Sequence, residues 1–136
     1  MKELEELLDA CTYDLEVFSI SYKMMGQMLD RENIKNKTKI LGLSDIYIYG
    51  GGYLGIQLYN VINQYVNVLS IVDRSGKILI DLSDIPIISL ENFKSVYKGQ
   101  KIIITPIKHY KSIYLELSKF ISTDKMIYLG EFLGGI

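Results

Sequence analysis

A run of glycines between a short apolar segment and a helical pattern constrains the fold of this chain more than any other feature. In the run 45–49, Asp45 is followed by alternating Ile and Tyr, which is typical of a buried strand, and the run ends at Gly50-Gly51-Gly52-Tyr53-Leu54-Gly55. Apolar side chains then recur at helical spacing up to residue 65. Strand, glycine turn and helix in this order predict a phosphate-binding turn. In it, Gly50 makes the tight turn, Gly52 lets an anion approach the backbone, and Gly55 lets the helix pack closely on the strand.

An acidic residue follows the second apolar run at the position where a nucleotide-binding turn would need it. Asp73 ends the run 66–72 and lies 18 residues beyond Gly55, and the pattern expects an acid roughly 20 residues on. Its carboxylate could accept both ribose hydroxyls of an adenosine, which favours NAD over NADP. The neighbouring Arg74 leaves NADP open, because a guanidinium can bind a 2'-phosphate. The alternative is that the glycines serve only the turn and that Asp73 caps a strand in solvent.

Short apolar runs alternate with helical patterns from residue 43 onward, which predicts a parallel sheet. We therefore predict a Rossmann-like three-layer α/β/α sandwich with about five parallel strands in the order 3-2-1-4-5. The ligand crevice of such a fold lies at the carboxyl ends of strands one and four. Thr105, Pro106 and His109 follow the fourth and most apolar run, so we add them to the candidate binding residues. The five runs are 45–49, 66–72, 85–89, 101–105 and 126–129.

The amino-terminal part has a different pattern. Apolar side chains from Leu4 to Leu29 recur every three or four residues, which predicts a long amphipathic helix, and the lysine-rich stretch 35–39 indicates a connector. We divide the chain into this helix with its connector, 1–38, and a nucleotide-binding domain, 39–136, within a single compact domain overall. The apolar stripe could mediate a homodimer or a contact with a partner protein. The tail 130–136 is expected to be loose.

Composition narrows the classes of partner. The chain has 136 residues and a net charge of -1, with lysines interleaved among acids, so we expect neither nucleic acid nor a membrane as a partner. No apolar run approaches the ~20 residues of a spanning helix, and the acidic amino terminus is unlike a secretory signal. One Cys and one His provide no usual zinc ligand set and fit a reducing compartment, so we expect a cytoplasmic protein without a metal. We assign no catalytic residue.

These segments resemble the small Rossmann-like NAD(P)-binding domains of bacterial polysaccharide and nucleotide-sugar proteins, which occur in epimerase/dehydratases and sugar transferases. The resemblance covers roughly residues 39–133. It implies a dinucleotide or nucleotide-sugar ligand at Gly50, Gly52, Gly55 and Asp73. In the full-length dehydratases this module precedes a separate catalytic domain, so the chain could be one domain of an NAD-dependent enzyme. The matching segments are IYIYGGGYLG (46–55), IVD (71–73), IPIISLE (85–91) and IIITP (102–106).

Three other functions stay open. The regulatory subunits of potassium transport also combine GxGxxG with an acid after the second strand, although the second half of this chain does not resemble theirs. An interaction module that has lost its ligand would act through residues 4–29. A domain that binds S-adenosylmethionine would also use a glycine turn and an acid at the end of the second strand.

Overall fold

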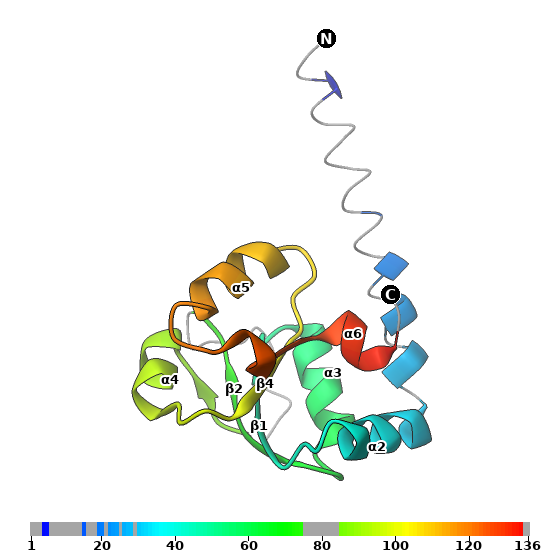
Figure 1. Ribbon diagram of the computed structural model, residues 1–136. Coiled ribbons are helices and arrows are strands. Elements are labelled where there is room, and N and C mark those ends of the chain that lie inside the picture. The colour runs from blue at the N-terminus through cyan, green and yellow to red at the C-terminus, as the bar shows by residue number, and fades with distance from the viewer. Residues whose placement is uncertain are drawn as a thin grey trace.

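The strands form one parallel sheet. The computed structural model (Figure 1) describes residues 30–74 and 85–134, together with positions 4, 5, 15, 19, 20, 22–24 and 26–28. The five strands lie in the order β3-β2-β1-β4-β5, which confirms the predicted order. Every neighbouring pair is parallel. The strands are β1 (Asp45–Tyr49), β2 (Asn67–Val72), β3 (Ile87–Ile88), β4 (Lys101–Ile104) and β5 (Met126–Tyr128).

Helices cover both faces of this sheet, which gives the three layers of a Rossmann-like α/β fold (Figure 1). One face carries α2, α3 and α6, and the other carries α4 and α5. The short 3-10 helix η1 (Thr123–Lys125) leads into β5. The helices are α2 (Arg31–Ile40), α3 (Tyr53–Ile62), α4 (Leu90–Val96), α5 (Tyr110–Leu117) and α6 (Leu129–Leu133).

Strand β1 is the middle strand and has its side chains buried on both faces. Successive side chains of a strand point to opposite faces. Accordingly, Ile46 and Ile48 pack in the core beneath α2, α3 and α6, whereas Tyr47 and Tyr49 pack beneath α4 and α5. This double burial explains why the strand has no polar alternation, as is usual in parallel sheets. The more apolar β4 is also an interior strand, between β1 and β5.

The expected connector at 35–39 is the second half of helix α2. Asp30 caps this helix by accepting a hydrogen bond from the backbone N–H of Asn33 at 3.1 Å. Ile34 and Thr38 are buried, and α2 packs against α3 and α6. Two of the three lysines of this stretch, Lys37 and Lys39, lie in the last turn of the helix, where the helix dipole favours positive charge.

The tail is not loose over residues 130–133, because these residues belong to α6. Leu129, Phe132 and Leu133 are buried in the same core as α2 and α3, and the helix ends at Gly134 with a φ of 93°. The long helix expected over residues 4–29 lies mostly outside the described residues, so the structure does not support it. The described Met24 and Met28 are buried in this core. Among the helices that the structure describes, none is long and apolar enough to cross a bilayer.

Candidate functional site

The turn between β1 and α3 brings the carboxyl ends of three strands together. Gly50 has a φ of 117°, a conformation that favours glycine, and its N–H donates to the carbonyl of Val72 at 2.7 Å. A Cβ at this position would collide with Thr105 Oγ1 and lie 3.0 Å from Pro106 Cδ. Gly50 therefore lets β1 turn tightly against the ends of β2 and β4.

Gly55 allows the first turn of α3 to lie directly on this glycine turn. Gly55 is buried, and a Cβ there would collide with the carbonyl oxygen of Gly50. It would also lie 3.2 Å from Thr105 Oγ1. Gly50 and Gly55 are therefore required by the packing of the fold, as the motif predicted for the tight turn and for close helix packing.

Gly52 is different, because the protein's own packing does not require a glycine there. It is the N-cap of α3 with a φ of -81°, and no atom lies within 4 Å of a Cβ built on it. No side chain caps this end of α3, and its first turn has no acidic residue. The next residue, Tyr53, is 66% exposed, while Leu54 packs against the core. The backbone of Gly52 thus faces open space at the amino end of a helix, where an anion is favoured.

Asp73 lies beside this turn at the end of β2. The N–H of Gly51 donates to Asp73 Oδ2 at 3.1 Å, and the N–H of Asp73 donates to the carbonyl of Ile88 at 3.0 Å. The residue thus links the carboxyl ends of β1, β2 and β3. One of its carboxylate oxygens holds the backbone of the glycine turn, a structural role that spacing in the sequence did not reveal.

Arg74 is directed toward helix α5. Its guanidinium Nη2 lies 3.8 Å from Oε2 of Glu116, and the Arg74 side chain is 79% exposed. At the other end of α5, the ring of Tyr110 lies 4.2 Å from the ring of Tyr128, the last residue of β5. Helix α5 therefore extends from the carboxyl end of β5 to that of β2 and borders the candidate site. Sequence reasoning missed Glu116, because nothing in its spacing connects it with Arg74.

Tyr49 is a buried titratable group next to these charges. It is the last residue of β1, and its side chain packs on the face that α4 and α5 cover. Burial raises the pKa of Tyr49, the negative charges of Glu116 and Asp73 raise it further, and Arg74 lowers it. Sequence patterns did not indicate that the pKa of Tyr49 is raised, because a strand tyrosine is more often a packing residue.

We expect the protein to lose stability above about pH 10, in part through Tyr49. Because the folded state raises the pKa of Tyr49, the unfolded chain releases the proton first as the pH rises. The stabilisation is fully present below about pH 10 and is lost as the pH rises through the pKa of the folded state. Urea unfolding from pH 7 to 11.5 should show a shallower alkaline decline in Tyr49→Phe than in the wild type. Tyr53→Phe, at an exposed position of α3, is the control, and equal declines in all three proteins would contradict the prediction.

Thr105 and Pro106 support the turn, and His109 lies in a neighbouring cavity. Thr105 is 2% exposed, and both its N–H and its Oγ1 donate to the carbonyl of Tyr49, at 3.0 and 2.8 Å. It therefore fastens β4 to β1. Pro106 borders Gly50, as described above. His109, which is exposed, lines a cavity of about 560 Å³ at the start of α5.

The structure thus separates the candidate binding residues into a cluster and two outliers. Asp73, Thr105 and Pro106 gather around the glycine turn, whereas Arg74 contacts α5 and His109 lines the cavity. Comparisons with models of known families, with curated proteins and with solved structures found no significant match to this chain. The function is therefore inferred from the geometry of the site.

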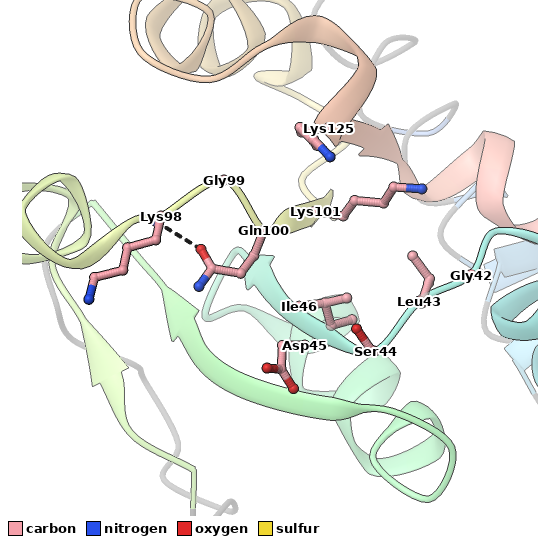
Figure 2. A pocket seen from close by; sticks show the side chains of 10 residues that line it. All are labelled: Gly42, Leu43, Ser44, Asp45, Ile46, Lys98, Gly99, Gln100, Lys101 and Lys125. Atoms are coloured by element: carbon pink, nitrogen blue, oxygen red, sulfur yellow. Dashed lines mark hydrogen bonds between the residues drawn. The ribbon is translucent and has the colours of Figure 1, made fainter.

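A second cavity, of about 290 Å³, lies at the opposite edge of the sheet, where β1 and β4 begin (Figure 2). Three lysines border it, but Lys101 Nζ donates to the carbonyl of Leu41 at 2.9 Å and the ammonium of Lys98 points away. The carboxylate of Asp45 accepts from Asn67 Nδ2 at 3.1 Å. Ligands of parallel α/β sheets bind at the carboxyl edge. We therefore assign this cavity no ligand.

Proposed function

We propose that the chain binds a dinucleotide, NAD(H), at the carboxyl ends of β1 and β2. The observation that supports this most is Gly52, whose backbone is bare, uncapped and open to solvent at the amino end of α3. Gly50 and Gly55 are explained by contacts within the fold, so they do not distinguish a binding turn from a structural one. Gly52 does distinguish the two kinds of turn, because a pyrophosphate that approaches the helix N–H groups needs a residue without a side chain at this position.

The residues around Gly52 fit the remaining parts of NAD(H). The hydrogen bond from Gly51 keeps Asp73 beside the turn, which supports the proposal that its carboxylate accepts hydrogen bonds from the adenosine ribose. The same negative charge would repel the 2'-phosphate of NADP, although Arg74, which is 79% exposed and 3.8 Å from Glu116, could still meet such a phosphate. Bound NAD would supply a hydride acceptor. The chain's own contribution is to bind and orient the cofactor.

The resemblance stated above supports a role in bacterial nucleotide-sugar or cell-surface polysaccharide metabolism. We propose that the chain acts there as the nucleotide-binding module of a cytoplasmic enzyme, with the substrate site completed elsewhere. A nicotinamide needs a second wall that holds the substrate against it, and a module of this size supplies one wall.

Isothermal titration with NADH tests the proposal. We expect saturable binding to the wild type and at least a tenfold higher Kd for Gly52→Val, because the added side chain would occupy the space where the pyrophosphate approaches. Asn60→Val is the control: it introduces valine at an exposed position of the same helix away from the turn, and its Kd should equal that of the wild type. Asp73→Asn should reduce the preference for NADH over NADPH, because the repulsive charge is gone.

Other ligands in the same titration distinguish the alternatives. Binding of S-adenosylmethionine that Gly52→Val abolishes, without binding of NADH, would replace the proposal with a methyl-donor site. Binding of UDP-glucose alone would indicate a nucleotide-sugar site. If none of the three ligands binds the wild type, the glycine turn serves only the fold and the proposal is wrong.

A further inference from the structure

The cavity that His109 lines has a lining suited to a phosphate group. This cavity, which we call the α5 cavity, has a volume of about 560 Å³, within the range of small-molecule sites. Lys108, His109 and Lys111 supply positive charge or hydrogen-bond donors, and the lining contains no carboxylate. Burial and the negative charge of Glu131 in α6 raise the pKa of Tyr110, which lines the cavity. The seven lining residues are Ile107, Lys108, His109, Tyr110, Lys111, Ser112 and Tyr128.

An apolar hollow adjoins the α5 cavity along the same helix. It has a volume of about 270 Å³ and is lined by Tyr110, Lys111, Tyr114 and Leu115. Tyr110 and Lys111 border both hollows, so the two hollows adjoin. The rings of Tyr110 and Tyr114 lie 6.0 Å apart, and Leu115 is 65% exposed, so its apolar side chain is accessible to a ligand. A ligand that spans both hollows would have an anionic end and an apolar end.

We propose that the α5 cavity and the adjoining hollow together bind a small phosphate monoester that carries an aromatic or apolar group. The phosphate lies among Lys108, His109 and Lys111, and the apolar group lies on Tyr114 and Leu115. A phosphate monoester carries about -1.5 to -2 charges at pH 7, so two lysines favour it over a carboxylate with a single charge.

This site is separate from the proposed dinucleotide site. Neither hollow is lined by a residue of the turn Gly50–Gly55 or by Asp73. Phenyl phosphate is therefore tested on the chain without NADH. Failure of one proposal leaves the other testable.

Phenyl phosphate is the probe that tests the site. We titrate the full chain with phenyl phosphate, benzoate, inorganic phosphate and phenol, and follow both the heat of binding and the backbone amide signals by NMR. Phenyl phosphate should bind at least about fivefold more tightly than each of the other three, and the shifted signals should lie at residues 107–115 and Tyr128. The double variant Lys108→Gln/Lys111→Gln should raise its Kd at least tenfold. Lys119→Gln, which removes an exposed charge beyond α5, should leave the Kd unchanged.

Three results would overturn the proposal. Benzoate or phenol that binds as tightly as phenyl phosphate would show that the phosphate is not recognised. An unchanged Kd in the double variant, or an equal loss in Lys119→Gln, would show that the two lysines of the cavity do not hold the ligand. If phenyl phosphate does not bind, or if it shifts the signals of other residues, the α5 cavity is not a phosphate monoester site. Leu115→Asn, at an exposed position, should weaken phenyl phosphate but not inorganic phosphate if the apolar end lies on α5.

Discussion

Gly55→Ala should lower the free energy of unfolding by about 3 kcal/mol, although it adds only one methyl group. Helix propensity alone predicts the opposite sign, because Ala is favoured over Gly in a helix by about 1 kcal/mol. The contact decides the sign, since the new Cβ would collide with the backbone carbonyl of Gly50, which cannot move without breaking the turn. Urea unfolding measures the change.

Gly52→Ala is the matched control for this substitution. The same methyl group meets no atom within 4 Å at Gly52, so the free energy of unfolding should change by no more than about 1 kcal/mol, the difference between the two residues at an N-cap. If Gly55→Ala leaves stability unchanged or raises it, helix α3 does not pack on the glycine turn as described.

Phe93→Ala should have the largest effect, a loss of about 3–5 kcal/mol in the free energy of unfolding. Phe93, a residue of α4, has no exposed surface and lies at the centre of an aromatic cluster between α4 and the sheet. Its ring centroid is 4.8 Å from that of Tyr47, 5.3 Å from that of Tyr97 and 5.8 Å from that of Phe120. The substitution removes these contacts and leaves a cavity. Domains are typically stable by about 5–15 kcal/mol, so the variant should retain only part of its stability.

Calorimetry on Phe93→Ala and Val96→Ala tests whether the loss of stability comes from the burial of the side chain or from its position in helix α4. Val96 is in the same helix but is 47% exposed, so its substitution should cost less than about 1 kcal/mol. Similar losses in the two variants would mean that α4 does not cover the sheet through Phe93.

The strands and their order could be predicted because each signal is local or follows from general rules of chain connection. Buried parallel strands require apolar runs of several residues, and the order 3-2-1-4-5 follows from a glycine turn of this kind. Two helices could not be predicted in this way. The 35–39 stretch has the composition of a loop, and α2 forms because Ile34 and Thr38 are buried against α3 and α6. The short α6 likewise depends on the burial of Phe132 and Leu133.

For the site, the sequence indicated the glycine turn and the acid but not how they are used. Only the three-dimensional structure shows that packing requires Gly50 and Gly55 but does not require Gly52. The difference depends on which atoms surround each Cα. The charges that act on Tyr49 and the ion pair between Arg74 and Glu116 involve residues that lie far apart in the chain, and no spacing rule relates them.

The sequence by itself determined the unit of strand, turn and helix at residues 45–62, because glycine backbone freedom and side-chain periodicity act within a few residues. Tertiary structure alone decided that Asp73 holds the turn through Gly51, that Arg74 faces Glu116, and that α5 carries a basic cavity at its start. The physical reason is that charges and hydrogen bonds between distant segments depend on packing, and packing is a property of the whole core.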